Sequence, residues 1–350
     1  MNLFKNYKTL KNLNTFKLDV KARSIQYVYS LQELILSWQY AQKYNLPVLL
    51  LGMGSNVLFI NNFNGMVIIN KIKKLKITES IHEWFIHVGA GNNWHQLIIK
   101  LMEKGIYGLE NMAFIPGTVG AAPIQNISAY GMEFKDVCNY VDVINLINLK
   151  QYRLNKSNCK FGYRNSIFQN TYYKNYAIIA VGLKLLKTWQ PRLTHTDLLC
   201  LKKHSITSQN ILNIIYKIRY KKIPNPKYIG NAGSFFKNAI LSKKKANLIK
   251  QQYPTCPIYP NSHNTVKISS AWLITQCNLK GYQIGGAAVD ATQALILINK
   301  NHATGNDIIK LAYFVHKTVL DKFNIYLEPE VNIIDINGKI NLRNNFYEPN

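Results

Sequence analysis

The stretch GNAGSFFKN, residues 230–238, places the hydroxyl of Ser234 directly after a glycine in a lysine-rich chain. Three roles suit this residue type: a nucleophile, a turn or capping residue, and a proton donor to a molecule bound nearby. A hydrolase nucleophile lies in the pattern G-x-S-x-G between a strand and a helix, whereas the order around Ser234 is G-S-F-F-K. This difference disfavours the nucleophile and leaves the turn residue and the proton donor open.

Two other stretches carry charged side chains that could stabilise an anion. Arg164, in FGYRNSIF, is one of only six arginines among 43 basic residues. Its planar fork of donors can bind a carboxylate through two parallel hydrogen bonds, which lysine cannot do. In LEPEV, Glu328 and Glu330 lie two residues apart, so on a strand they would share one face. Their spacing alone does not choose between them, and a solvent-facing edge carboxylate beside Pro329 is an equally simple interpretation of Glu330.

Small residues gather in three turns of the first 131 residues. Residues 52–56 lie between two predicted strands, residues 89–91 precede a predicted helix, and residues 116–122 follow an apolar stretch. None completes G-x-G-x-x-G between a strand and a helix, which disfavours a Rossmann dinucleotide site. Tight turns of small residues nevertheless let backbone N–H groups approach a pyrophosphate closely. With Ser55 and Asn56 as side-chain donors, the three turns together predict a bound dinucleotide.

Strands and helices occur in mixed order around these residues. Apolar patterns predict strands at 22–29, on both sides of the first glycine turn within 47–60, and at 326–334 around Glu330. Helical periodicity predicts helices at 30–44 with a capping box of Ser30 and Glu33, at 93–105, at 208–222 and at about 307–323. The helix at 93–105 would turn Trp94, Leu97, Ile98 and Leu101 inward. Because strands and helices do not alternate as in a doubly wound sheet, the α+β class is favoured.

The formal net charge of +26 invites comparison with nucleic-acid-binding proteins. The lysines, however, are spread along the whole chain, whereas a dedicated binder usually concentrates its basic residues on one element. We therefore expect no specific nucleic-acid partner. Five widely spaced cysteines without C-x-x-C indicate a reducing compartment, and we find no secretory signal or apolar run long enough to span a bilayer. These features predict a cytoplasmic protein without membrane insertion, and we expect no metal site.

Six stretches together resemble a known enzyme family. They are LGMGSNVLF, HVGAGNNWH, GLENMAFIPGTVGAAPIQNISAYG, FGYRNSIF, GNAGSFFKN and LEPEV. In order and spacing, from about residue 18 to 335, they are similar to the UDP-N-acetylenolpyruvoylglucosamine reductases, flavoenzymes that complete the muramic acid of peptidoglycan. The resemblance implies a two-part FAD-binding region of the vanillyl-alcohol-oxidase (PCMH) type and a separate α+β substrate-binding domain. The insert before Lys222 resembles the longer of two family types.

The resemblance also predicts how the chain is divided. The helix at 208–222 ends before Pro224 and Pro226, which marks a domain boundary. Residues 1–70, with 324–350 returning to them, would form the first FAD-binding subdomain and residues 71–222 the second. Residues 223–323 would form the substrate-binding domain.

The reaction implied by the resemblance has two halves. NADPH gives a hydride to FAD and leaves, and the reduced flavin then passes a hydride to the enolpyruvyl carbon of the substrate. The neighbouring carbon must be protonated, and the resemblance assigns Ser234 as that acid. Because a serine hydroxyl is a weak acid, other groups must disperse the developing charge. The resemblance assigns this to Arg164, which would hold the carboxylate and the enolate oxygen, and to Glu330.

By the same resemblance, further residues contact the two ligands. FAD would be bound by Gly52, Gly54, Ser55, Asn56, Gly117, Gly120, Ala121 and Arg219. The uridine diphosphate sugar would be bound by Tyr130, Tyr163, His195, Lys222, Asn238 and Gln293. Lys222 suits a diphosphate as a point charge, although a lysine that interacts with the dipole of a helix C-terminus is a rival explanation.

Two positions depart from the family pattern. His195, in PRLTHTDLL, stands where the substrate loop of the family has a tyrosine. An imidazole keeps an aromatic face and a donor but titrates near neutral pH, and an exposed loop-tip residue without a ligand contact is the alternative. Ser128 stands before Ala-Tyr-Gly where the family usually has glycine, so the loop would be strained if this residue needs a positive φ.

Two other functions compete with the reductase. A flavin oxidase on the same fold would reduce its flavin with its substrate and react with oxygen. Such enzymes often bind the flavin covalently through His or Cys, and only His95, after the second glycine turn, would suit that here. A decayed basic binding protein would have no reason to retain Arg164, Ser234 and Glu330. We therefore predict a monomeric reductase with non-covalent FAD and with NADPH as its hydride donor.

Overall fold

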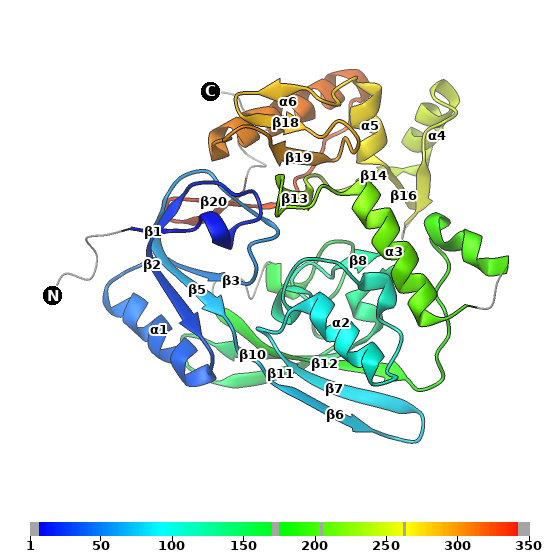
Figure 1. Cartoon of the computed structure of the whole chain (residues 1–350). Coiled ribbons are helices and arrows are strands. Elements are labelled where there is room, and N and C mark those ends of the chain that lie inside the picture. Colours follow the sequence, from blue (N-terminus) through cyan, green and yellow to red (C-terminus); the bar gives the residue numbers. More distant parts are fainter. Residues whose placement is uncertain (1–6, 170–174, 204–205, 262–263, 342–350) are drawn as a thin grey trace. The chain divides into compact units, whose positions relative to one another are not determined.

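The computed structural model describes residues 7–169, 175–203, 206–261 and 264–341 (Figure 1). Its contacts divide the chain into two compact units. Unit 1 comprises residues 1–23, 54–64 and 222–350, and unit 2 comprises residues 24–53 and 65–221. The chain passes from unit 2 into unit 1 for the last time between Lys221 and Lys222, shortly before Pro224. The finer division into three parts stays a prediction.

Unit 2 contains a five-stranded antiparallel sheet in the order β11-β10-β12-β7-β6. Its strands are β6 Leu75–Glu79, β7 Glu83–Gly89, β10 Cys138–Asn145, β11 Gln151–Asn155 and β12 Tyr176–Leu186. Helix α2 (Trp94–Glu103) lies along one face of this sheet (Figure 1). Its buried residues are the four predicted ones, Trp94, Leu97, Ile98 and Leu101, and they share one hydrophobic core with β7, β10 and β12. Each such side chain contributes roughly 1.5–3 kcal/mol when fully buried.

A parallel pair of strands forms another part of unit 2. β3 (Val48–Leu51) pairs with β5 (Phe63–Asn70) in parallel, and β2 (Lys21–Val28) is the other neighbour of β5. Helix α1 (Leu31–Lys43) precedes β3 and begins after Ser30, whose Oγ accepts the N–H of Glu33 at 3.1 Å. The Glu33 carboxylate accepts the N–H of Tyr29 at 2.9 Å. The predicted cap by Ser30 is therefore confirmed, whereas the return bond of a capping box is not, because Glu33 accepts the N–H of Tyr29 and not that of Ser30.

Short elements fill the rest of unit 2. They are η2 Glu110–Met112, η3 Val119–Ala121, β8 Ser128–Ala129, β9 Met132–Glu133, η4 Phe134–Asp136, η5 Ile167–Gln169 and η6 Thr196–Lys203. β8 and β9 form a small antiparallel hairpin in which Ser128 lies opposite Glu133. Helix α3 (Ser208–Lys222) has the predicted bounds and carries the chain to the end of this unit.

Unit 1 is built from three separate segments of the chain. Its sheets have the orders β13-β19-β18-β17, β14-β16-β15 and β21-β20-β4. Its strands are β4 Val57–Phe59, β13 Gly230–Ser234, β14 Ala239–Ser242, β15 Ile258–Pro260, β16 Thr265–Ile268, β17 Gln283–Ile284, β18 Ala287–Val289, β19 Ile296–Asn299, β20 Asn332–Asp335 and β21 Gly338–Ile340. Its other elements are β1 Lys8–Thr9, η1 Lys11–Leu13, α4 Lys243–Gln252, α5 Ser270–Gln276 and α6 Gly305–Phe323. The parallel pairing of β4 with β20 joins the second segment to the C-terminal one.

The strand predicted at 326–334 is only partly present, so that prediction was wrong in its first half. β20 begins at Asn332, and before it the backbone makes one isolated bridge, between Pro329 and Phe236. This bridge is made by the N–H groups of Glu330 and Lys237, so it needs no donor from Pro329, and the pairing of the chain then passes to β4 at Asn332. Glu328 and Glu330 consequently do not lie on a strand but in a segment that is hydrogen-bonded to the residues after Ser234.

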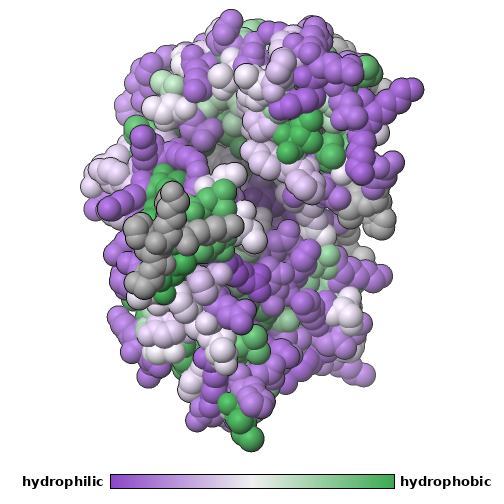
Figure 2. Space-filling view, turned by 90° about the vertical axis from the view of Figure 1, so that its right-hand side faces the viewer, coloured by the Kyte–Doolittle hydropathy of each residue, from purple (hydrophilic) through white to green (hydrophobic). Residues whose placement is uncertain are grey.

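The face drawn in Figure 2 is mostly hydrophilic, and its apolar residues form small patches. This surface agrees with a chain in which 43 lysines and arginines are spread over the sequence. In the described parts of the chain, no helix has both the length and the apolar character that crossing a membrane requires.

Candidate active site

The glycine turns predicted to bind a dinucleotide meet within unit 2. A Cβ on Gly52 would lie 2.7 Å from Oγ1 of Thr118, and a Cβ on Gly120 would lie 2.6 Å from the Cβ of Ala90. Both distances are far shorter than an ordinary van der Waals contact, so a larger residue would force its neighbours to move. The turn at 116–122 is therefore packed directly against each of the other two.

Backbone hydrogen bonds also join the second and third turns. The N–H of Gly120 donates to the carbonyl of Ala90 at 2.9 Å, and the N–H of Val119 donates to that of Asn92 at 2.9 Å. These two donors are used within the protein, so the donors for a pyrophosphate must come from other positions of the turns. The turns bring backbone and small side chains together without bulky groups between them. This arrangement fits the close approach of FAD, with Gly117, Gly120 and Ala121 as predicted contacts.

The second half of the first turn belongs to unit 1. Gly54 has a φ of 63°, and a Cβ there would lie 1.9 Å from the carbonyl oxygen of Leu13, so glycine is required for two reasons. After Ser55, the side chain of Asn56 donates to the carbonyl of Glu330 at 3.2 Å. A predicted cofactor-binding residue and a predicted catalytic residue are thus hydrogen-bonded to each other within unit 1.

Arg219, predicted to reach the FAD phosphates, is hydrogen-bonded to the side chain of Tyr130, predicted to contact the substrate. Burial lowers the pKa of Arg219 below its usual value, whereas the Tyr130 hydroxyl favours the charged guanidinium. Burial likewise raises the pKa of Tyr130, against the effect of the nearby cation. A cation in partly desolvated surroundings attracts an anion more strongly than one in water. The pair therefore suits a site that binds phosphate groups.

His95, the residue considered for covalent flavin attachment, makes contacts within unit 2. Its Nδ1 accepts the N–H of Phe114 at 3.2 Å, and the centroids of the two rings lie 4.2 Å apart. Burial, and then the charge of Arg219, lower the pKa of His95, which agrees with a neutral ring whose Nδ1 accepts a hydrogen bond. These contacts give His95 a structural role and favour non-covalent FAD.

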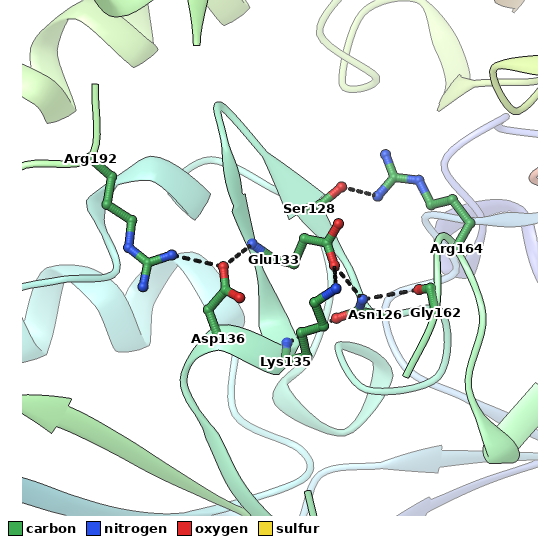
Figure 3. A network of polar contacts seen from close by, with 8 residues as sticks. All are labelled: Asn126, Ser128, Glu133, Lys135, Asp136, Gly162, Arg164 and Arg192. Carbon is green, nitrogen blue, oxygen red and sulfur yellow. Dashed lines mark hydrogen bonds and ion pairs between the residues drawn. The ribbon is translucent and has the colours of Figure 1, made fainter. Parts of the chain in front are cut away.

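Arg164 occupies a tight turn of unit 2. Gly162 and Asn165 exchange backbone hydrogen bonds of 2.9 and 3.3 Å across this turn, and Arg164 has a φ of 49°. A bulky residue in the left-handed region persists only where the surrounding structure holds it. Nη1 of the guanidinium donates to Oγ of Ser128 at 2.7 Å (Figure 3). Tyr163, a predicted substrate contact, precedes Arg164 in the same turn.

Ser128, which stands where the family usually has glycine, does not have the positive φ that would strain its backbone. It lies in β8, and the positive φ angles around it belong to Asn126 at 46°, Tyr130 at 47° and Gly131 at 82°. Asparagine tolerates this region better than most residues, whereas tyrosine does not. The strained backbone is therefore at the predicted substrate-binding tyrosine and not at the serine.

Ser234 and Glu330 are brought together in unit 1. Ser234 is exposed at the end of β13, where it pairs with Ile296. The next residue, Phe235, is buried, and its carbonyl accepts the N–H of Glu330 at 2.7 Å. The predicted acid and the predicted carboxylate thus lie on adjacent, hydrogen-bonded segments.

The contacts of Lys237 distinguish the two carboxylates of LEPEV. Its Nζ lies 2.9 Å from Oε1 of Glu328, and its N–H donates to the Glu328 carbonyl at 2.9 Å. Glu328 is therefore held in an ion pair with the segment that follows Ser234. This ion pair is a structural contact of Glu328, and the choice of Glu330 as the carboxylate that takes part in the reaction stays a prediction from the family resemblance.

The remaining predicted substrate contacts lie in both units. In unit 1, Oδ1 of Asn238 accepts the N–H of Ser270 at 3.2 Å. The N–H of Gln293 donates to the Asp290 carboxylate at 2.7 Å. Lys222 is exposed at the end of α3. In unit 2, the ring centroid of His195 lies 5.2 Å from that of Tyr130 in an edge-on arrangement. Two predicted substrate contacts, from segments far apart in the sequence, are therefore neighbours.

The sequence pattern gave no indication of Asn126, a polar residue that is only 1% exposed. Its Nδ2 donates to the carbonyl of Gly162 at 3.0 Å and to Oε2 of Glu133 at 2.8 Å, and its Oδ1 accepts the N–H of Lys135 at 2.9 Å. Asn126 thereby joins the turn of Arg164 to the β8–β9 hairpin (Figure 3). Its place two residues before Ser128 is the only signal in the sequence that could have drawn attention to it.

Two family models match this chain. The FAD binding domain matches residues 23–147, and the C-terminal domain of UDP-N-acetylenolpyruvoylglucosamine reductase matches residues 225–334. Among solved structures, UDP-N-acetylenolpyruvylglucosamine reductase from Thermus caldophilus aligns with a TM-score of 0.63 at 20% identity, covering 94% of this chain and 98% of that chain. At this identity the likeness shows the fold alone, which is α+β, and the family model shows that the first part of the chain is an FAD binding domain.

Similarity to curated relatives extends over nearly the whole chain. The UDP-N-acetylenolpyruvoylglucosamine reductase of Escherichia coli (strain K12) is 49% identical over 332 residues, covering 95% of this chain and 97% of the relative. That of Buchnera aphidicola subsp. Baizongia pistaciae (strain Bp) is 52% identical over 330 residues, covering 94% and 99%. This chain therefore belongs to the UDP-N-acetylenolpyruvoylglucosamine reductase family, FAD-binding oxidoreductases of peptidoglycan synthesis.

Proposed function

We propose that this protein catalyses the NADPH-dependent, FAD-mediated reduction of UDP-N-acetylglucosamine enolpyruvate to UDP-N-acetylmuramate. The observation that best supports this proposal is the hydrogen bond between the segments of Ser234 and Glu330 in unit 1. It joins the N–H of Glu330 to the carbonyl of Phe235 at 2.7 Å. A hydroxyl donor and a carboxylate on adjacent segments suit the protonation of a carbon that has become carbanion-like.

Bound FAD would supply the hydride that reaches the enolpyruvyl carbon. Ser234 would then give its Oγ proton to the neighbouring carbon, and Glu330 would hold or return the proton exchanged at Oγ. The exposure of Ser234 at the end of β13 supports this assignment, because a substrate can reach an exposed hydroxyl.

Arg164, a residue of unit 2, would bind the substrate carboxylate and stabilise the enolate oxygen. Its guanidinium can offer two parallel donors to a carboxylate, and its charge opposes the negative charge that develops during the reaction. The backbone conformation of Arg164, with a φ of 49°, supports a functional role because strained residues concentrate at functional sites. Tyr130, Tyr163, His195, Lys222, Asn238 and Gln293 are proposed contacts of the uridine diphosphate sugar.

The visible spectrum of the purified protein, recorded without oxygen, tests this proposal. Addition of NADPH should bleach the absorption of oxidised flavin, and addition of the enolpyruvyl substrate should restore it. Failure of NADPH to bleach the flavin, or failure of the substrate to restore it, would refute the reductase. Bleaching by a substrate and not by NADPH, followed by recovery when oxygen is admitted, would instead identify a flavin oxidase.

The proposal includes a cytoplasmic location and a monomeric state. The described cysteines Cys138, Cys159, Cys256 and Cys277 are not in disulfide bonds, which suits a reducing compartment. Light scattering after size-exclusion chromatography would test the monomer. A dimer would refute that part of the proposal and leave the reaction unaffected.

A further inference from the structure

Ser128 contacts the guanidinium of Arg164 in unit 2. Its Oγ accepts a hydrogen bond from Nη1 at 2.7 Å, and both residues are partly buried (Figure 3). A hydrogen bond with an ionised donor is roughly twice as strong as one between neutral groups. Glycine, which the family usually carries at this position, has no side-chain atom that could accept it. The contact is therefore a consequence of the serine in this chain.

The β8–β9 hairpin holds the Ser128 hydroxyl in place. Ser128 lies opposite Glu133 in this hairpin, and the next pair is Ala129 with Met132. The buried side chain of Asn126 donates to the carbonyl of Gly162, where the turn of Arg164 begins, at 3.0 Å. The hairpin and the turn are thus joined through the side chain of Asn126 as well as through Ser128 and Arg164.

The acidic residues of this network are paired with other cations. Oε2 of Glu133 lies 2.8 Å from Nζ of Lys135, and Oδ2 of Asp136 lies 2.8 Å from Nη1 of Arg192 (Figure 3). The hydroxyl of Ser128 is neutral, so its contact with Nη1 can orient the guanidinium without itself adding a negative charge beside it.

We propose that Ser128 is a positioning residue that orients the guanidinium of Arg164 for the enolpyruvyl carboxylate. This inference rests on the role proposed for Arg164. The turn fixes the backbone of Arg164, but an arginine side chain still carries about 2 kcal/mol of rotamer entropy. A bond to Nη1 removes part of that freedom before the substrate arrives and uses one of the five N–H donors of the group. The other donors then meet the carboxylate at a lower entropic cost.

Three substitutions at Ser128 test the proposal. Ser128→Ala and Ser128→Gly should each raise the KM for the enolpyruvyl substrate about tenfold, the effect of one lost charge-assisted hydrogen bond. Reduction of the flavin by NADPH and the flavin content should stay at wild-type values. Ser128→Thr keeps a hydroxyl and should restore most of the affinity. Ser128→Gly introduces the usual residue of the family, so we expect it to fold.

Binding of UDP-N-acetylglucosamine separates positioning from a general structural effect. This compound lacks the enolpyruvyl carboxylate, so a flavin spectral titration should give the same dissociation constant for Ser128→Ala and the wild type. Equal weakening of UDP-N-acetylglucosamine and of the enolpyruvyl substrate would overturn the positioning role. Ser80→Ala is a matched control, because the Ser80 Oγ accepts the N–H of Glu83 at 3.1 Å in the loop between β6 and β7. It should leave both ligands unaffected.

A double-mutant cycle with Arg164→Lys tests whether Ser128 acts through Arg164. In the Arg164→Lys background, Ser128→Ala should cause little further loss, whereas a full additional tenfold loss would overturn the inference. If Arg164→Lys alone leaves KM and flavin reoxidation unchanged, the proposed role of Arg164 is wrong and the inference fails with it. If Arg164→Lys impairs the reaction while Ser128→Ala behaves as the wild type, only the inference about Ser128 fails.

Discussion

Glycine is required for different reasons in two regions of the molecule, the packed turns of unit 2 and the residue before Ser234 in unit 1. In unit 2, a Cβ on Gly91 would lie 2.4 Å from the carbonyl carbon of Lys71, and a Cβ on Gly120 would lie 2.6 Å from the Cβ of Ala90. In unit 1, a Cβ on Gly233 would meet no atom within 4 Å, but its φ of 71° is one that other residues rarely adopt. Close packing therefore requires the first two glycines, whereas backbone conformation alone requires Gly233.

The difference matches what each region is expected to bind. A dinucleotide is held by backbone groups along its length, so the turns that receive it must approach one another and the ligand closely. A reaction at one carbon needs a few side chains that point in chosen directions, and the backbone beneath them needs the right conformation. We therefore expect substitutions of the packed glycines to release the flavin and substitutions around Ser234 to impair the reaction.

The largest effect is expected for Gly91→Ala, which should abolish flavin binding and with it all activity. The added methyl group would meet backbone atoms of Lys71 and Ile72 at 2.4 and 2.5 Å. Backbone atoms cannot move aside as a side chain can, so the cost should reach or exceed the upper end of the ~1–3 kcal/mol typical of overpacking. The ratio of flavin to protein absorbance measures the outcome.

Gly105→Ala is the control for Gly91→Ala. A Cβ on Gly105 would meet nothing within 4 Å, although its φ is 73°. This variant should retain its flavin and lose only the roughly 1–2 kcal/mol of stability that the left-handed conformation costs a non-glycine residue. A wild-type flavin content in Gly91→Ala would contradict the packing explanation.

The next largest effect is expected for Ser234→Ala. Loss of a positioned general acid typically costs ~10²-fold to 10⁴-fold, and here the loss should fall on flavin reoxidation by the substrate. Reduction of the flavin by NADPH should be nearly unchanged, and Ser234→Cys should recover part of the rate because a thiol can also donate a proton. Stopped-flow absorbance measures both halves, and equal slowing of the two would indicate a structural serine.

A smaller effect is expected for Gly233→Ala. Nothing obstructs the methyl group, but the left-handed conformation costs a non-glycine residue roughly 1–2 kcal/mol. The variant should retain flavin, unfold at a lower urea concentration and lose less activity than Ser234→Ala. Gly233→Asn should be milder still, because asparagine tolerates this region. Flavin loss as severe as that expected for Gly91→Ala would remove the contrast between the two units.

The smallest effect concerns His195 and pH. Its Nδ1 accepts the N–H of Asp197 at 3.2 Å and lies 3.7 Å from the carboxylate of that residue. A dianionic diphosphate beside an imidazole stabilises its charged form, so binding would take up a proton and tighten as the pH falls from ~8 to ~6. The KM for the substrate should fall over this range in the wild type and stay constant in His195→Tyr. A constant KM in the wild type, or the same slope in both proteins, would show that His195 does not contact the diphosphate.

Local patterns in the sequence predicted helices well. The four buried residues of α2 and the bounds of α3 follow from apolar spacing and from the prolines after residue 222, which are properties of neighbouring residues. The packing of the three glycine turns could not be predicted in this way, because it depends on contacts between residues far apart in the sequence. For the same reason, the sequence could not predict that the N–H groups of Val119 and Gly120 donate hydrogen bonds to the second turn.

The candidate site was less accessible to sequence reasoning. The departure from the family pattern at Ser128 suggested backbone strain at that residue. The positive φ angles instead belong to Asn126 and Tyr130, and a single departure from a pattern cannot show this. Its contact with Arg164 depends on the register of a short hairpin and on the turn that Asn126 holds, and no local pattern encodes either. Apolar spacing also predicted a continuous strand through Pro329, where the chain makes an isolated bridge to Phe236 before its pairing passes to β4.

The pairing of β4 with β20 has a consequence for the order in which the chain folds. The side chain of Asn56 reaches the carbonyl of Glu330 across 274 positions of the sequence, and Val57 pairs with Asn332. Closing so long a loop costs entropy before the new contacts can offset it, and β20 leaves the ribosome after every segment of unit 2. All segments of unit 2 have been synthesised by residue 221, so this unit can fold while unit 1 is still incomplete. A nascent chain should therefore complete unit 2 first, and a chain truncated before Asn332 should lose not only a strand but also the support of the turn at 54–56.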